Sequence, residues 1–367
     1  MPAERPRSAL YLDANATEPL RPEARAAALA AMDIEGNPSS VHAAGRAARR
    51  VLEVSRERLA ACFGAAPADL VFTAGGTEAN ALAVSGLGGG RRVLVGATEH
   101  PAVLAAAPGA EILPVLGDGT LDLAALEQAL AGPPALVCLM AANNETGVLH
   151  PLAEAAALCR AAGALLHVDA VQAAGRLPIA VGDADSLAIS GHKLGGPKGA
   201  GALLLRSGLA LRALVAGGGQ ERGRRGGTEP LPALAGMAAA AEAARPGEAI
   251  RLAALRDALE SACLASGARI AGAGAPRLPN TTSLILPGVP AETQVIALDL
   301  AGVRVSAGAA CSSGKVGRSH VLAAMGLGED AACAVRVSLP WNAPEDAADR
   351  FVAAWSGMRA RLSRSAA

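Results

Sequence analysis

Short apolar runs separated by alanine-rich helical segments dominate the chain from residue 65 to residue 205. Six runs lack an alternating polar face: Leu70–Thr73, Arg92–Gly96, Ala135–Met140, Ala164–Val168, Ser186–Ser190 and Gly201–Leu205. Such runs are typical of strands in a parallel sheet that is covered by helices on both sides. Leu121–Leu130 and Pro151–Ala162 between them have helical patterns, and Asp122 is a candidate N-cap for the first. The pattern therefore predicts an α/β domain with a mainly parallel sheet.

A second, smaller unit is expected after a long alanine-rich helix that ends near Ala244–Pro246. Beyond that point two segments have helical patterns, Glu248–Ser266 and Glu345–Leu362. Three segments have strand patterns, Thr282–Leu286, Val303–Ser306 and Ala334–Leu339. We expect a large domain over residues 14–245 and a smaller α+β domain formed by residues 1–13 and 246–367.

The composition excludes several classes of protein. Lys plus Arg equals Asp plus Glu at 33 each, so no basic excess is present to neutralise a nucleic-acid backbone. No stretch approaches the roughly 18 apolar residues of a membrane span, and Met1–Leu12 lacks the apolar core of a secretory signal. The six cysteines include no C-x-x-C pair, which indicates neither a zinc site nor a disulfide framework. We expect a cytoplasmic protein with free thiols and no bound metal, which binds neither nucleic acid nor membranes.

Polar motifs directly follow three of the predicted strands, where open parallel sheets bind their ligands. In T-A-G-G-T-E-A-N, Gly76 and Thr77 are candidates for binding a phosphate at a helix start, although Thr77 could be an ordinary N-cap. In A-T-E-H-P, His100 could stack on a flat ring and move protons, or be a surface-loop histidine. In A-N-N-E-T-G, Asn144 could donate to a ring hydroxyl or a substrate carboxylate, and a polar turn is equally compatible.

Asp169 ends the apolar run Ala164–Val168, within the motif H-V-D-A-V-Q. A carboxylate is costly to bury at such a position, which suggests a cationic partner such as a protonated pyridine nitrogen. Gln172 could then contact an oxygen on the same ring. A structural ion pair is the alternative interpretation of Asp169.

Lys193 follows the run Ser186–Ser190 and precedes a glycine-rich stretch, in S-G-H-K-L-G-G-P-K-G. A lysine amine held in a pocket can form a Schiff base with an aldehyde. Ser190 and His192 flank it and could bind a phosphate. The second lysine of the motif, Lys198, is the competing candidate, and a solvated loop lysine is the plain alternative.

Cys311 lies among small and polar residues in a predicted loop, V-S-A-G-A-A-C-S-S-G-K. Cysteines 62, 138, 159 and 263 fall in helical or strand patterns and are expected to be small core residues. A thiol on an accessible loop is the better nucleophile, provided that its pKa falls below the free value of about 8.5. Arg336, in A-V-R-V-S, could clamp a substrate carboxylate with its planar fork, or could point outward from a strand.

Together these motifs resemble the cysteine desulfurases of iron–sulfur cluster assembly and nitrogen fixation, a branch of the class V pyridoxal-phosphate enzymes. The likeness runs from Tyr11 to about Trp341 and includes G-N-P-S-S-V-H and S-H-V-L-A-A-M-G. It implies the PLP-dependent transferase fold of type I, with a mainly parallel seven-stranded sheet in the large domain. It also implies a homodimer.

The resemblance assigns roles to the motif residues. Lys193 matches the lysine that holds pyridoxal 5'-phosphate as a Schiff base, and Cys311 matches the cysteine that carries a persulfide. His100 matches the histidine stacked on the cofactor ring. The remaining matches contact the cofactor or the substrate: Asp169 at the pyridine nitrogen, Gln172 at the ring hydroxyl, Gly76, Thr77, Ser190 and His192 at the phosphate, Thr228 at the phosphate of the second subunit, and Asn144 and Arg336 at the substrate carboxylate.

The implied reaction removes sulfur from L-cysteine, gives L-alanine, and leaves a persulfide on Cys311. An acceptor protein in iron–sulfur cluster or other sulfur-cofactor assembly would receive that sulfur. Three alternatives share the fold. A class V enzyme for another amino acid would have no use for Cys311, a selenocysteine lyase would use the same residues, and a sulfur-relay protein without turnover would not need an intact Lys193.

Overall fold

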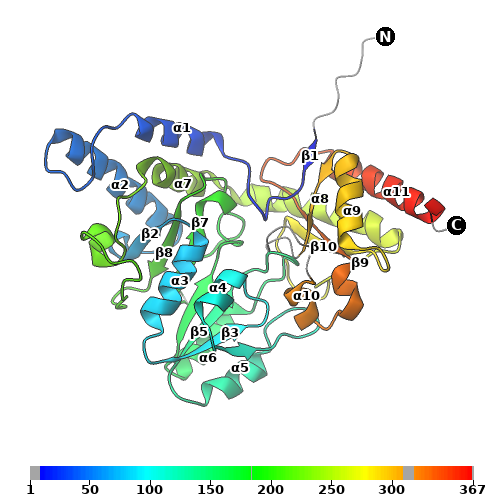
Figure 1. Ribbon diagram of the computed structural model, residues 1–367, viewed down its shortest axis with the longest axis horizontal. Coiled ribbons are helices and arrows are strands. Elements are labelled where there is room, and N and C mark those ends of the chain that lie inside the picture. The colour runs from blue at the N-terminus through cyan, green and yellow to red at the C-terminus, as the bar shows by residue number, and fades with distance from the viewer. Residues whose placement is uncertain (1–8, 183, 309–317, 366–367) are drawn as a thin grey trace, which may run out of the picture.

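The computed structural model describes residues 9–182, 184–308 and 318–365. Its largest element is a seven-stranded sheet with the order β2-β8-β7-β6-β5-β3-β4 (Figure 1). The strands are β2 (Leu70–Thr73), β3 (Arg92–Gly96), β4 (Glu111–Leu113), β5 (Ala135–Met140), β6 (Leu165–Asp169), β7 (Ser186–Ser190) and β8 (Gly201–Leu205). Neighbouring strands are parallel except where β8 pairs with β2 and β7. The predicted mainly parallel seven-stranded sheet is confirmed.

The six strands expected from apolar runs are all present, and β6 is shifted by one residue. The strand β4 was not expected, because two of its three residues are exposed and it lies at the sheet edge. The apolar pattern also did not reveal that β8 is antiparallel. A strand covered on both faces is apolar on both sides whichever way it runs, so composition alone does not report its direction.

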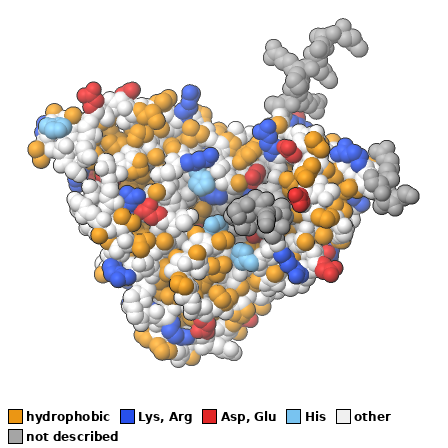
Figure 2. All heavy atoms as spheres, in the orientation of Figure 1, with side chains coloured by type: hydrophobic (Ala, Val, Ile, Leu, Met, Phe, Trp, Pro, Cys, Tyr) orange, Lys and Arg blue, Asp and Glu red, His pale blue; other side chains and the backbone are white. Residues whose placement is uncertain are grey.

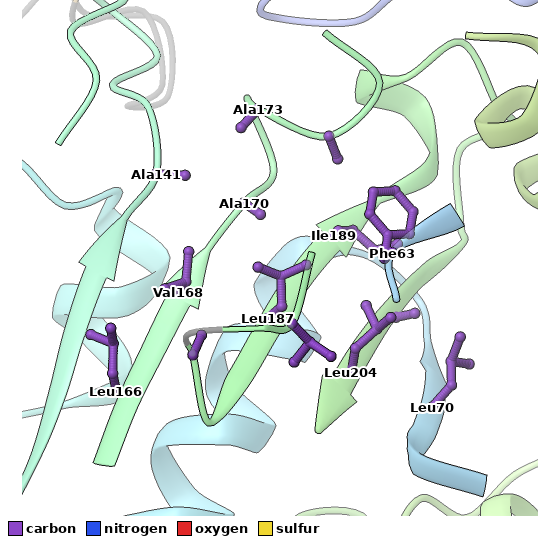
Figure 3. Close-up of a cluster of buried hydrophobic side chains, with 14 of the residues drawn as sticks. Phe63, Leu70, Ala141, Leu166, Val168, Ala170, Ala173, Leu187, Ile189 and Leu204 are labelled. Atoms are coloured by element: carbon purple, nitrogen blue, oxygen red, sulfur yellow. The ribbon is translucent and has the colours of Figure 1, made fainter. Parts of the chain in front are cut away.

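Helices cover both faces of this sheet. On one face, alternate side chains of β2, β6, β7 and β8 form a continuous apolar layer (Figure 3). This layer packs against α2 (Ala43–Cys62), α5 (Leu123–Leu130), α6 (Leu152–Ala161) and α7 (Leu231–Ala243). The other face packs against α3 (Gly76–Leu87) and α4 (Pro101–Ala106). Asp122 caps α5 as expected, since its carboxylate accepts from the N–H groups of Ala124 and Ala125.

A second apolar core surrounds a four-stranded antiparallel sheet with the order β12-β13-β10-β9. These strands are β9 (Arg269–Ile270), β10 (Thr281–Ile285), β12 (Ser306–Ala307) and β13 (Ala334–Ser338). The short strand β1 (Leu10–Tyr11) pairs with β11 (Val303–Arg304), and Leu10 and Leu12 belong to this core. The single strand expected over Val303–Ser306 is wrong, because β11 pairs with β1 whereas β12 pairs with β13.

The helices of the second unit are α8 (Pro246–Ala265), α9 (Ala291–Leu300), α10 (His320–Ala324) and α11 (Ala347–Ser365). The expected helices over 248–266 and 345–362 correspond to α8 and α11. The remaining long helix, α1 (Pro22–Met32), contacts α7 of the first unit. Within the residues described, none of the helices combines the length and the apolar character needed to cross a bilayer. The domain boundary at residue 245 stays a prediction.

A buried ion pair joins α2 to the glycine-rich segment after β8. The Arg56 guanidinium donates to both carboxylate oxygens of Glu221, at 2.7 and 2.8 Å, and the side chains are only 4% and 1% exposed. The N–H of Phe72 in β2 donates to the same carboxylate at 2.8 Å. Glu221 has a φ of 48°, a left-handed conformation that is uncommon outside glycine. The ion pair therefore holds Glu221 in this uncommon backbone conformation.

We expect Arg56→Leu to lower the free energy of unfolding by about 3–5 kcal/mol, because it leaves the Glu221 carboxylate buried without its cation. Arg58→Leu is the matched control on the same helix. Its ion pair with Glu242 is 41% and 39% exposed, and such pairs contribute about 0–1 kcal/mol. Urea denaturation followed by circular dichroism measures both variants. Equal losses in the two variants would contradict the role given to Arg56.

Candidate functional site

A cavity of about 200 Å³ opens at the carboxyl ends of β5, β6 and β7. Most of the residues singled out from the sequence line it: Gly76, Thr77, His100, Asn144, Asp169, Gln172, Ser190, His192 and Lys193. Four further lining residues were not selected from the sequence, namely Asn80, Met140, Ala142 and Val171. Figure 2 shows histidine side chains gathered near the centre of one face, with charged side chains of both signs scattered around them.

Asp169 is the last residue of β6, opposite Met140 of β5 and Ala188 of β7. It is 6% exposed, and its carboxylate accepts from Asn80 Nδ2 at 2.7 Å and from the Val171 N–H at 2.9 Å. Burial raises the pKa of this carboxyl group, while the two donors and the nearby His100 and Lys193 oppose that rise. The site therefore holds a carboxylate that a cation in the cavity would stabilise.

Lys193 follows β7 in a short turn, Gly191–Lys193. Its amine donates to the backbone carbonyls of Asn15 and of Ala16, the latter at 3.1 Å. The Asn15 carbonyl also accepts from Gln172 Nε2 at 3.0 Å, and Asn15 Nδ2 donates to the Asn144 carbonyl at 3.0 Å. Asn15 therefore connects three lining residues. The signal that could have pointed to Asn15 is its place near Tyr11, where the likeness to the family begins.

The start of α3 and the end of β7 supply donors for an anion. The N-cap of α3 is Gly75, which has no side chain, so the first-turn N–H groups remain available to a ligand. A Cβ on Gly76 would lie 2.6 Å from Val171 Cγ2, so only glycine permits this close approach. His192, which also lines the cavity, contacts Thr17 Oγ1 at 3.1 Å, and burial with nearby lysine charges lowers its pKa to about 4.

His100 is the N-cap of α4. Its Nδ1 accepts from the Ala102 N–H at 3.1 Å, so in the neutral ring the proton resides on Nε2. Burial lowers the pKa of His100 below its ordinary value, the charge of Asp169 opposes this, and Lys193 adds to it. The ring is consequently neutral at pH 7, and Nε2 is the nitrogen that can exchange a proton.

Arg336 does not line the cavity but contacts its wall. It lies on β13, is 2% exposed, and donates to the Asn144 carbonyl at 3.2 Å and to Asp13 Oδ1 at 2.7 Å. The alternative of an outward-pointing strand arginine is therefore wrong. The sheet of the second unit brings Arg336 beside Asn144, as a shared substrate-binding role would require.

Cys311 lies outside the described residues. The described residues on either side of that segment lie beside the same carboxylate, that of Glu145, which follows Asn144. Ser319 Oγ donates to Glu145 Oε2 at 2.6 Å, and a Cβ on Gly308 would lie 2.7 Å from that oxygen. The chain thus enters and leaves the segment that contains Cys311 next to the cavity wall.

The other cysteines differ in exposure. Cys138, Cys159 and Cys263 are buried as expected, and burial raises the pKa of Cys159 and of Cys263 to about 12. Cys62 was expected in the core and this is wrong, because it is the last residue of α2 and its side chain is exposed there. Cys333 is partly buried. None of these five thiols lines the cavity.

Thr228 is exposed on the surface of this chain and does not line the cavity. Its segment is attached to the start of α3, because Arg225 Nε donates to Glu78 Oε1 at 2.7 Å. Two charged residues of this segment, Glu221 and Arg225, are engaged in ion pairs. That Thr228 reaches the phosphate of a second subunit stays a prediction.

His150 supports the turn that leads to His100. Its Nδ1 accepts from the Leu121 N–H at 3.1 Å, and its Nε2 lies 3.2 Å from Thr98 Oγ1. Burial lowers the pKa of His150 to about 4. The unfolded chain, with a histidine pKa of about 6.5, binds this proton first as the pH falls. The contribution of the neutral, buried His150 to the free energy of unfolding is therefore fully present above about pH 6.5. It is lost as the pH falls from about 6.5 to about 4.

We expect the free energy of unfolding to fall steeply in that pH range, and His150→Gln to make the fall shallower. The difference in pKa corresponds to a contribution on the order of 3 kcal/mol for this one group. Urea denaturation of both proteins at several values between pH 7 and pH 4.5 measures the two slopes. Parallel slopes would show that His150 does not titrate as its burial implies.

Comparison with known proteins places these observations in a family. The aminotransferase class-V profile matches residues 10–351. A cysteine desulfurase of Cereibacter sphaeroides is 45% identical over 351 residues, which cover 90% of each chain. The solved NifS-like protein of Rickettsia africae superposes with a TM-score of 0.89 at 33% identity, covering 96% of this chain and 99% of that one. A structure titled SspA in complex with cysteine superposes with a TM-score of 0.77 at 29% identity, covering 90% and 99%.

Proposed function

Because the chain belongs to the cysteine desulfurases of the aminotransferase class-V family, we propose that it binds pyridoxal 5'-phosphate in this cavity and holds the sulfur of L-cysteine on Cys311. The observation that carries the proposal is the presence of the buried Asp169 carboxylate and the Lys193 amine in one cavity. A pyridine nitrogen and an aldehyde are complementary to these two groups.

The donor set of the cavity fits this cofactor. Asp169 offers a carboxylate to the pyridine nitrogen, and a cation there would compensate for the water that burial has removed. Lys193 offers an amine to the aldehyde, and His100 a neutral ring that can stack. The remaining contacts are Gln172 for the ring hydroxyl, Asn144 for the ring or the substrate, and Gly76, Thr77, Ser190 and His192 for the phosphate.

When bound, the cofactor withdraws electrons from the Cα of an amino acid and makes the Cα proton acidic. The Lys193 amine removes that proton. Asn144 and the Arg336 guanidinium orient the substrate carboxylate, and their contact at 3.2 Å keeps the two groups together. His100 Nε2 exchanges protons near the substrate, since Nδ1 is occupied by the Ala102 N–H.

Cys311 then takes the sulfur. Its thiolate attacks the substrate sulfur, so that an S–S bond forms and the Cβ–S bond of the substrate breaks. The electron pair of the broken bond stays with the carbon skeleton, which is protonated and leaves as alanine. The proximity of Gly308 and Ser319 to Glu145, next to Asn144, supports this placement of Cys311 near the substrate.

The persulfide on Cys311 passes its outer sulfur to an acceptor protein, or a thiol reductant releases it as sulfide. We place this transfer in the assembly of iron–sulfur clusters or other sulfur-containing cofactors, as the family implies. A cytoplasmic location stays a prediction of the sequence.

We expect the purified protein with pyridoxal 5'-phosphate, L-cysteine and a thiol reductant to give sulfide and alanine in equal amounts. Cys311→Ser should lose at least about a hundredfold in rate, because a hydroxyl cannot form the persulfide. It should still bind L-cysteine and change the absorption of the cofactor. Lys193→Ala should lose all turnover. Cys62→Ser is the control, since it removes an exposed thiol outside the cavity.

If Cys311→Ser formed sulfide and alanine at the full rate, the role proposed for Cys311 would be overturned. Cofactor absorption that depends on Lys193, with no alanine formed from cysteine, would instead indicate a class V enzyme for another amino acid. If selenocysteine is turned over faster than cysteine, and Lys193→Ala and Cys311→Ser affect its turnover as they affect that of cysteine, the protein would be a selenocysteine lyase.

We further propose a homodimer in which Thr228 reaches the cofactor phosphate of the partner subunit. Its exposed position, on a segment attached to α3 by the Arg225–Glu78 ion pair, supports this arrangement. Light scattering should give twice the chain mass of 36.2 kDa. Thr228→Ala should weaken cofactor binding by about tenfold, the loss expected for a single hydrogen bond to a charged group. A monomer with full cofactor affinity would contradict the proposal.

A further inference from the structure

A line of polar side chains crosses one otherwise apolar face of the large sheet. His167 of β6 and Ser186 of β7 are register partners, and both are 0% exposed. Asn80 of α3 packs over them and is 2% exposed. Their surroundings on this face are apolar residues such as Leu136, Cys138 and Ala188. Polar groups buried in such a layer are costly unless each one has a hydrogen-bond partner.

These side chains form a continuous chain of hydrogen bonds that ends on Asp169. Ser186 Oγ lies 2.8 Å from His167 Nδ1, and His167 Nε2 lies 2.9 Å from Asn80 Oδ1. Asn80 Nδ2 then donates to Asp169 Oδ2 at 2.7 Å. Because the Asn80 carbonyl oxygen can only accept, His167 carries its proton on Nε2. His167 Nδ1 therefore accepts from the Ser186 hydroxyl, and every donor points towards Asp169.

We propose that Ser186, His167 and Asn80 are positioning residues that hold Asp169 as an oriented carboxylate, an inference that rests on the proposed cofactor site. The chain has two possible polarities. In the reverse one, the Asn80 amide turns over and presents its carbonyl oxygen to Asp169, which then has to carry a proton to donate. The observed polarity therefore goes together with an ionised Asp169.

His167 is suited to this role because it stays neutral. Burial lowers its pKa to about 3, so the ring keeps one donor and one acceptor throughout the physiological range. The Ser186 hydroxyl satisfies the Nδ1 acceptor of this tautomer, and the Nε2–H of His167 in turn holds the Asn80 carbonyl oxygen and opposes rotation of the amide. None of the hydrogen bonds of this chain reaches the residues assigned to the substrate carboxylate, Asn144 and Arg336.

The test is Ser186→Ala, which removes one oxygen atom that is three hydrogen bonds away from Asp169. The readouts are the dissociation constant of pyridoxal 5'-phosphate, the absorption of its complex, and kcat and KM for L-cysteine. We expect a tenfold weaker cofactor affinity and a tenfold lower kcat, at the lower end of the effects known for outer residues that orient a ligand. KM should change less than twofold.

Two further variants make the test specific. In an Asp169→Asn background, Ser186→Ala should add less than a twofold change, because the carboxylate it orients is gone. Ser55→Ala is the matched control: Ser55 is also buried, and its hydroxyl bonds the Val51 carbonyl at 2.7 Å on α2. It should leave cofactor affinity unchanged. His167→Phe, which breaks the chain at its centre, should follow Ser186→Ala in direction.

Equal effects of Ser186→Ala in the parent and in the Asp169→Asn background would show a general packing role and overturn the inference. The inference would also be overturned if Ser186→Ala left the cofactor affinity unchanged while Asp169→Asn weakened it. A parent protein that binds no pyridoxal 5'-phosphate would overturn the proposed function and this inference with it. If His167→Phe does not fold, the Ser186→Ala comparison decides alone.

Discussion

Burial of the Asp169 carboxylate at the end of β6 is the constraint on which the site depends. Removing a carboxylate from water is costly, and the neighbouring strands are apolar along nearly their whole length. The Asn80 amide and the Val171 N–H offset part of that cost, at 2.7 and 2.9 Å. The rest has to come from positive charge in the cavity, where Lys193 already contributes. An acid buried at this position therefore favours a cationic group in the cavity.

The two apolar cores meet in the segment that follows β1. Leu10 and Leu12 pack in the core of the smaller sheet, and the Ala14 N–H bonds the Ser338 carbonyl at 3.0 Å. One residue later, Asn15 contacts Lys193 and the Asn144 carbonyl of the large unit. The position of the amine is consequently coupled to the packing of the second sheet. The same sheet brings Arg336 to Asn144, so the two residues proposed to bind the substrate carboxylate come one from each unit.

The sequence predicted what depends on local pattern and did not predict what depends on tertiary contact. Long apolar runs located six strands of the sheet, whereas β4 was missed because an exposed edge strand has no such run. The cavity residues that follow strands were found because parallel strands end at one edge. Asn80 and His167 were not found, since the contact between them joins positions 87 residues apart and has no local signature. Cys62 was placed in the core because a helical pattern does not show which side the last turn presents.

A second buried acid clarifies why Asp169 carries the charge. Glu99, next to His100, is 0% exposed, and burial together with the charge of Asp169 raises its pKa well above the ordinary range. Its Oε1 accepts from the Met140 N–H at 2.6 Å, but its Oε2 has no hydrogen-bond partner among the described residues. Asp169, in contrast, has a donor on each oxygen. Two neighbouring buried carboxyl groups do not both ionise readily, and the one with more donors keeps the charge. Glu99 is therefore the neutral acid of the pair, and the hydrogen bonds from Asn80 and Val171 determine that the negative charge resides on Asp169.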